Sequence, residues 1–293
     1  MGDNMKSIAA AIFALSIAAP AAVAQTSVAP STATSRPESM AVGADGTLYI
    51  GSTLDARIYR ARPGQAVAEQ FVDLRPSAFV LGVLADSPSN TLWACEMISM
   101  DRSSPMLKGK SSLRSFDLNS GAPKLNIPLP GEINLCNDFV VGPDKALYIA
   151  DTLNGKILRL RPGANTLETV VQSAALFGVD GITFLDGTLY VNTIWAGGLY
   201  RIPDATSAKA GAPVQIHTSR VLRAPDGMRV QNGVMFLSES ANNTVSAVTV
   251  KDDMATITPI RTDLEGPCAV EPHGKSLWVV ERPAHRVTAV PIP

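Results

Sequence analysis

Four oxygen-bearing side chains lie far apart in this 293-residue chain, each at the start of a strand-like run. They are Glu38, Asn137, Asp180 and Asp226. Carboxylate and amide oxygens are the ligands that hard divalent cations prefer. If they converge, the three carboxylates repel by ~3 kcal/mol per pair at about 5 Å and an effective dielectric near 20, so a cation is needed to compensate. The residue types predict one divalent cation, with Ca²⁺ favoured and Mg²⁺, Mn²⁺ or Zn²⁺ as alternatives.

A sequence repeat gives these residues a reason to converge. Each copy reads as an apolar strand, a polar turn, a β-branched and aromatic strand of the LYI type, a loop and a third strand. The first strands are marked by positions 38, 81, 137, 180, 226 and 266, which are 43, 56, 43, 46 and 40 residues apart. Repeats of this length built from strands are typical of propeller blades. The sequence predicts an all-β fold over residues 36–293, a six-bladed β-propeller of four-stranded antiparallel blades.

The repeat assigns one equivalent position, here called the slot, to each blade. Alignment on the apolar residue four places later puts the following residues in the slot: Glu38, Leu81, Asn137, Asp180, Asp226 and Gly266. The first strands of a propeller line its channel, so we expect the slots to form a ring around the axis. Alone, an Asp-Gly pair is a common turn and an Asn-Asp pair a common cap. Their coincidence in one slot favours the metal site.

The N-terminal segment has the pattern of an export signal. Lys6 precedes an apolar run over residues 8–19, and Ala22 and Ala24 supply the small residues of a cleavage site. Residues 1–24 are therefore predicted to be a signal peptide, and the protein to be exported to the periplasm or secreted. Residues 25–35 are either a linker or a strand that closes the ring. No later run approaches the ~20 apolar residues of a membrane span.

Charge and cysteine content narrow the partners. The 25 basic and 26 acidic residues leave a net charge of -1, which excludes a nucleic-acid surface and a polybasic membrane patch. We expect a small-molecule substrate and a monomer. The three cysteines allow at most one disulfide and leave at least one thiol free; as single residues they are typical of small buried apolar positions.

The chain resembles the senescence marker protein/gluconolactonase/luciferin-regenerating enzyme family over about residues 36–293. The resemblance is carried by PES with Glu38, CND with Asn137, VDG with Asp180 and PDGM with Asp226. It implies that these four residues bind the cation and that Asp226 is the catalytic base. Asp180 stands where the family usually has Asn. Leu135 stands where sugar-lactone hydrolysing members have Arg, so substrates are not carried over with the fold.

These observations favour a metal-dependent hydrolase of a lactone or related ester. The residues expected to contact substrate are Leu81, Met97, Leu135, Trp195 and Glu239, with ordinary packing as the alternative for Trp195. An insertion at 98–111 is expected to form a lid. Phosphotriester hydrolysis at the same site and a non-catalytic binding propeller are the alternative functions. The three histidines show no spacing that indicates a Ser-His-Asp triad.

Overall fold

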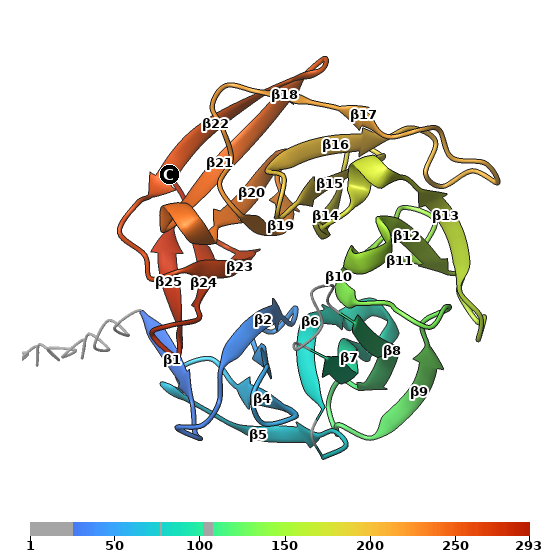
Figure 1. Ribbon diagram of the computed structural model, residues 1–293. Coiled ribbons are helices and arrows are strands. Elements are labelled where there is room, and N and C mark those ends of the chain that lie inside the picture. The colour runs from blue at the N-terminus through green and yellow to red at the C-terminus, as the bar shows by residue number, and fades with distance from the viewer. Residues whose placement is uncertain (1–25, 77, 102–107) are drawn as a thin grey trace, which may run out of the picture.

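Six blades of β-sheet surround a central axis in the computed structural model, which describes residues 26–76, 78–101 and 108–293 (Figure 1). The fold is the predicted six-bladed propeller. In the described ranges the helices are single 3₁₀ turns: η1 (Ser87–Ser89), η2 (Thr152–Asn154), η3 (Ala174–Leu176) and η4 (Ser240–Asn242). No helix in these ranges is long and apolar enough to cross a bilayer. The predicted signal peptide lies outside the described residues.

The blades follow one another along the chain, each with its first strand innermost. Blade one is β2 (Pro37–Val42), β3 (Leu48–Ser52), β4 (Arg57–Ala61) and β5 (Val67–Asp73). Blade two is β6 (Phe79–Asp86), β7 (Thr91–Asp101), β8 (Lys108–Asp117) and β9 (Pro123–Pro128). Blade three is β10 (Cys136–Val141), β11 (Leu147–Asp151), β12 (Lys156–Leu160) and β13 (Glu168–Gln172).

The second half repeats this order with small variations. Blade four is β14 (Val179–Leu185), β15 (Thr188–Thr193), β16 (Gly198–Ile202) and β17 (Val214–Gln215). Blade five is β19 (Pro225–Gln231), β20 (Val234–Glu239), β21 (Thr244–Lys251) and β22 (Met254–Arg261), with β18 (His217–Thr218) parallel to β22. Blade six is β23 (Pro267–His273), β24 (Ser276–Glu281) and β25 (Arg286–Pro291), completed by β1 (Ser27–Pro30).

Burial on both faces of each blade holds the ring together. The described residues form one apolar cluster at each interface between neighbouring blades. In β3, Tyr49 belongs to the cluster shared with blade two, whereas the next residue, Ile50, belongs to the cluster shared with blade six. Successive strand residues point to opposite faces, so an apolar run such as LYI fits a strand that is covered on both sides.

The N-terminal strand closes the ring. β1 pairs antiparallel with β25 of blade six, through Ser27 and Thr288, and parallel with β5 of blade one, through Ala29 and Val67. Val28 is buried in the cluster between these two blades. The first and last blades are therefore joined by hydrogen bonds, which leaves blade six without an open edge.

Blade two carries the predicted insertion as an extension of its middle hairpin. The β7–β8 ladder continues from Thr91 paired with Asp117 out to Asp101 paired with Lys108. Residues 102–107, at the centre of the expected lid, lie outside the described residues. A disulfide joins Cys95 on β7 to Cys136 on β10, so it links blades two and three, and Cys268 is a free buried thiol.

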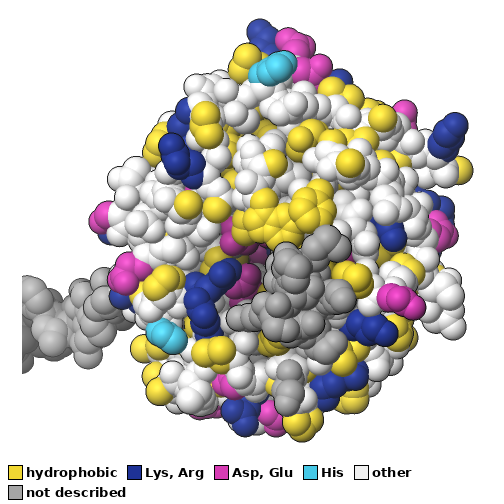
Figure 2. Space-filling view, viewed as in Figure 1, with side chains coloured by type: hydrophobic (Ala, Val, Ile, Leu, Met, Phe, Trp, Pro, Cys, Tyr) yellow, Lys and Arg dark blue, Asp and Glu magenta, His cyan; other side chains and the backbone are white. Residues whose placement is uncertain are grey.

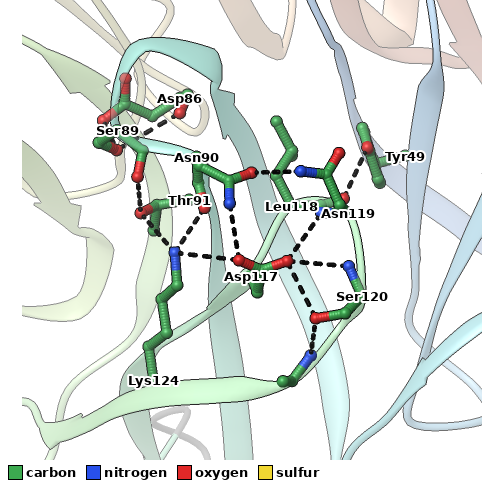
Figure 3. A network of polar contacts seen from close by, with 11 residues as sticks. Tyr49, Asp86, Ser89, Asn90, Thr91, Asp117, Leu118, Asn119, Ser120 and Lys124 are labelled. Atoms are coloured by element: carbon green, nitrogen blue, oxygen red, sulfur yellow. Dashed lines mark hydrogen bonds and ion pairs between the residues drawn. The ribbon is translucent and has the colours of Figure 1, made fainter.

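A polar network fixes the outer turn of blade two (Figure 3). The Asp117 carboxylate accepts hydrogen bonds from the backbone N–H of Asn119 and Ser120 and from the Asn90 side-chain amide. The Tyr49 hydroxyl donates to the Leu118 carbonyl at 2.9 Å, which ties blade one to this turn. The hydrogen bond from the Ser120 backbone lowers the pKa of Asp117. This acid is satisfied locally and is structural.

Candidate functional site

A bulge in every first strand builds the predicted ring. In each of the six inner strands the pairing register shifts by one residue at the slot. Bulges turn a side chain out of its regular alternation and occur often beside active sites. The pocket at the channel mouth is lined by all four predicted ligands, Glu38, Asn137, Asp180 and Asp226, and by Leu81. Figure 2 shows acidic side chains at the bottom of this hollow.

The sixth slot is occupied by Cys268, and the assignment of Gly266 to it is wrong. Pro267 pairs with Glu281 and Ala269 with Val280, so the bulged residue between them is Cys268, which also lines the pocket. Gly266 precedes the strand, with φ +51°. The sequence alignment took Val270 as the residue four places after the slot. Its pairing with Val279 puts it only two places after the slot, as Met40 paired with Ile50 is in blade one. An error of two residues leaves the inside-outside pattern unchanged.

Close contacts between neighbouring blades set the height of the ring. A Cβ on Gly181, next to Asp180, would overlap the Asp226 carbonyl of the next blade, so this position requires Gly. Buried Asn192 donates to that carbonyl at 2.7 Å and accepts from the Gly181 N–H at 3.3 Å. The Cys268 thiol donates to the Glu38 carbonyl at 3.1 Å in the same way between blades six and one. The slot side chains are therefore held on a rigid frame.

The three carboxyls of the ring, Glu38, Asp180 and Asp226, are here called the ring acids. Burial raises the pKa of each, and for Asp180 and Asp226 the shift is large. The charge of Glu38 adds to the increase at Asp180, and the charges of Asp180 and Glu38 add to it at Asp226. Asn137 donates a 2.8 Å hydrogen bond to Asp180, which offsets little of this. Ionisation of all three ring acids is therefore unfavourable unless a positive charge compensates it.

Arg282, from the loop between β24 and β25, reaches into the ring. Its guanidinium forms an ion pair with Glu38 and lies 3.7 Å from Asp226, and it hydrogen-bonds the Cys268 thiol. Burial opposes the charge of this guanidinium, but the thiol and the two carboxylates outweigh that cost and raise its pKa. One guanidinium cannot neutralise three carboxylates, so the site still attracts a further positive charge.

A second ion-pair layer lies behind the ring. Arg229 of blade five bonds both oxygens of Asp138 in blade three, at 2.7 and 2.8 Å, and Glu271 of blade six at 3.0 Å. Burial raises the pKa of Glu271 to about 7, against the effect of Arg229. Asp138 follows Asn137 in the chain, and both line the pocket with Arg229. The layer ties three blades across the axis and supplies no free cation to the ring.

The donor set fits a hard divalent cation in chemistry and charge. It offers three carboxylates and one amide oxygen, and a double positive charge would balance what Arg282 leaves uncompensated. Among the described residues, no three acids, histidines or cysteines lie close enough together to coordinate one ion. Arg282 lies between Glu38 and Asp226, so a cation would require this side chain to move.

The predicted substrate residues divide into two groups. Leu81 lines the pocket, and Trp195 is 50% exposed. Met97 and Leu135, in contrast, are buried in the apolar cluster between blades two and three and do not line the pocket. Both side chains pack in the interface between the blades, so the structure gives them a packing role and places neither at the pocket.

Glu239 is also placed away from the pocket. It is fully buried and accepts hydrogen bonds from the Arg220 guanidinium, the Arg223 backbone N–H and the Asn242 amide. Similar acids lie at the equivalent position of three other second strands, which is the last residue of β11 and β24 and the point in β7 where its extension begins. We call this set the strand-end acids: Glu96, Asp151, Glu239 and Glu281. Each accepts from a backbone N–H in the segment that enters its own blade. They are structural, and Glu239 is not free to bind substrate.

The structure adds residues that the sequence reasoning missed. Phe177, 54% exposed, lies with its ring centroid 4.9 Å from that of Trp195, and Trp195 packs on Gly178. Gly178 precedes Asp180 by two residues, so this aromatic pair stands at the mouth end of blade four. Figure 2 shows a broad apolar patch beside the hollow. Arg282 and Cys268 were also missed; Cys268 was recoverable from the Pro residues that precede the slots in PES, PDG and PCA.

Comparisons with known proteins support the fold. No protein-family model matches the chain, and no curated protein matches it in sequence. A gluconolactonase from Xanthomonas campestris matches in structure at 17% identity and TM-score 0.67, over 89% of this chain and 87% of its own. Virginiamycin B lyase from Staphylococcus aureus matches at 13% identity and TM-score 0.64, over 91% and 98%.

A third solved structure widens the range of chemistry on this fold. The PQQ-bound aldose sugar dehydrogenase of Streptomyces coelicolor matches at 16% identity and TM-score 0.62, over 91% of this chain and 96% of its own. A lactonase, a lyase and a dehydrogenase thus resemble this chain about equally. Such neighbours identify the architecture, while the activity has to be argued from the side chains of the site.

Proposed function

We propose that the chain is an exported, metal-dependent hydrolase of a lactone or related ester. One observation carries the proposal: three buried carboxyls and an amide meet at the channel mouth with one guanidinium to compensate them. Such an arrangement is costly to stability, and perturbed acids gathered in a pocket are typical of catalytic sites. The signal-like segment at 1–24 supports export.

The cation would be held by Glu38, Asn137, Asp180 and Asp226. When bound, it would polarise the substrate carbonyl and stabilise the negative charge that develops on its oxygen. Asp226 would take a proton from the attacking water while the water oxygen bonds to the carbonyl carbon. The bond from that carbon to the ester oxygen of the substrate then breaks, and Asp226 returns the proton to this leaving oxygen. A carboxylate held beside the attacking water is suited to act as a general base.

The surroundings of the pocket favour a substrate with an apolar group. Leu81 is the apolar member of the ring, and the Phe177–Trp195 pair presents exposed aromatic faces at the mouth. Aromatic faces bind apolar groups by excluding water from both surfaces. We therefore propose a lactone or ester with an alkyl or aromatic substituent.

A panel assay tests the proposal. The mature protein would be stripped with chelator, reloaded with Ca²⁺ and assayed on alkyl lactones, aryl esters and phosphotriesters. We expect turnover of lactones or esters that disappears on chelation and returns with the cation, while circular dichroism shows the sheet intact. Preference for phosphotriesters would move the chemistry to phosphorus. No turnover of any class would favour a binding propeller.

A further inference from the structure

Arg282 occupies a place in the ring where a cation is expected. It forms an ion pair with Glu38 and lies 3.7 Å from Asp226, two carboxylates on adjoining sides of blade six. It is not a slot residue: it comes from the β24–β25 loop, one residue after the strand-end acid Glu281. The side chain therefore enters the ring from outside the frame that holds the other members.

The contacts of Arg282 are incomplete for a purely structural ion pair. Its Nε is buried and has no hydrogen-bond partner among the described residues. The side chain is nevertheless 28% exposed, so it has a route to solvent. A buried donor without a partner costs free energy, and a long flexible side chain with solvent access can leave by rotation alone. The arrangement is suited to a side chain that can be exchanged.

Two other arginines of the fold, one buried and one partly exposed, are held differently. Arg229 bonds two oxygens of Asp138 and one of Glu271 with good geometry and is almost fully buried. Arg286, four residues after Arg282, pairs with Glu281 and Glu265 away from the ring. Neither contacts a ring acid in the described structure. The Nε of Arg114 is also buried without a partner, but Arg114 pairs with Glu96 away from the ring, so Arg282 is distinguished by its position among the predicted ligands.

We infer that Arg282 is an internal counter-ion that competes with the divalent cation for Glu38 and Asp226. This inference rests on the proposed cation site. With the cation absent, the guanidinium would limit repulsion among the ring acids and keep the channel mouth folded. Binding of the cation would drive the guanidinium out, because two positive groups at one site repel strongly in a buried environment. The chain would thereby set its cation affinity lower than the four ligands alone would give.

Titration calorimetry with Ca²⁺ on chelator-stripped protein tests this. Arg282→Gln should bind Ca²⁺ about tenfold or more tightly than the wild type, since the competing charge is lost. Arg282→Lys should fall between the two, because it keeps the charge on a shorter side chain. Arg286→Gln is the matched control: it removes the same charge from the same blade and should leave the affinity within about twofold, since an exposed charge away from the site is screened.

A second readout separates competition from simple charge compensation. In chelator, Arg282→Gln should melt below the wild type, and saturating Ca²⁺ should remove that difference. Ca²⁺ binding by the glutamine variant alone would also support the inference. Equal or weaker binding by Arg282→Gln, with the wild type binding Ca²⁺, would overturn the inference and leave the cation site standing. Absence of binding in every variant would overturn both.

Discussion

Two sets of buried acids on the same scaffold have opposite surroundings. Among the strand-end acids, Glu96 lies between Arg75 and Arg114, and Glu281 accepts from Arg286 and the Glu265 backbone. Burial works against the charge of these two carboxylates, but their hydrogen bonds outweigh it and lower the pKa. The ring acids instead have raised pKa values, first because burial disfavours their charge and, at Asp180 and Asp226, also because neighbouring carboxylates repel it.

The contrast separates fully paired acids from acids that lack sufficient compensation. Evolution of a stable fold favours buried carboxylates that are fully paired, and an under-compensated cluster persists where a ligand or a reaction needs it. Asp151 is an intermediate case: burial raises its pKa, although its carboxylate accepts hydrogen bonds from the Leu135 N–H and the Asn154 amide. Depth of burial alone therefore does not identify a site; the balance of partners does.

The largest expected effect comes from Asp226. Asp226→Asn keeps an oxygen ligand but removes the proposed base, so turnover should fall by about 10²- to 10⁴-fold while the cation stays bound. Asp180→Asn gives the amide that the family resemblance implies at this position, so the loss of turnover in this variant should be several-fold smaller. Kinetics at saturating Ca²⁺, with metal content measured alongside, checks this. Equal losses at the two positions would mean that total charge governs the site and that Asp226 is not the base.

The strand-end acids should affect stability instead. Glu239→Ala leaves the Arg220 guanidinium, the Arg223 N–H and the Asn242 amide without their acceptor, so unfolding free energy should fall by about 2–4 kcal/mol. The exposed Glu69 is the control, and Glu69→Ala should change stability by no more than about 0.5 kcal/mol. Urea unfolding measures both. A Glu239→Ala variant with native stability and altered KM would return this residue to the substrate site.

Glu271, behind the ring, predicts a pH dependence. Below pH 4.5 both the folded and the unfolded chain hold its proton. Between pH 4.5 and about 7 the unfolded chain releases the proton first, so the folded state loses stability as the pH rises, by at most about 3 kcal/mol. Glu271→Gln should remove this slope. Melting temperatures at pH 5, 6, 7 and 8 in both proteins check it, and parallel curves would assign the slope to other groups.

The aromatic pair should have the smallest effect. Trp195→Ala should raise KM for an alkyl or aryl substrate, corresponding to a loss of about 1–2 kcal/mol of apparent binding free energy. The kcat should be nearly unchanged, since the indole is remote from the reacting atoms. Val221, exposed on another loop, is the control, and Val221→Ala should leave KM unchanged. If Trp195→Ala lowers stability and leaves KM as it was, Trp195 is an ordinary packing residue.

Much of the fold and part of the site follow from the sequence. Period-two alternation and the repeat predict the blades, and the repeat predicts which four polar residues meet in the pocket, because equivalent positions in a propeller are equivalent in space. The same periodicity misplaced the sixth slot, since a shift of two residues, from Cys268 to Gly266, leaves the alternation of a strand pattern unchanged. The roles of Glu239 and Arg282 could not be predicted, because they depend on partners elsewhere in the sequence. Glu239 accepts a hydrogen bond from Arg220, and Arg282 forms an ion pair with Glu38, 244 positions earlier in the chain.

Direct measurement of cation binding tests the central claim. Titration of chelator-stripped wild type with Ca²⁺ should show one site per chain, and combined Glu38→Gln, Asp180→Asn and Asp226→Asn should abolish it. Glu239→Gln, which alters a buried acid of the other set, should retain it. A wild type that binds neither Ca²⁺ nor Mn²⁺, or a triple variant that still binds with wild-type affinity, would contradict the claim that the ring acids form a metal site.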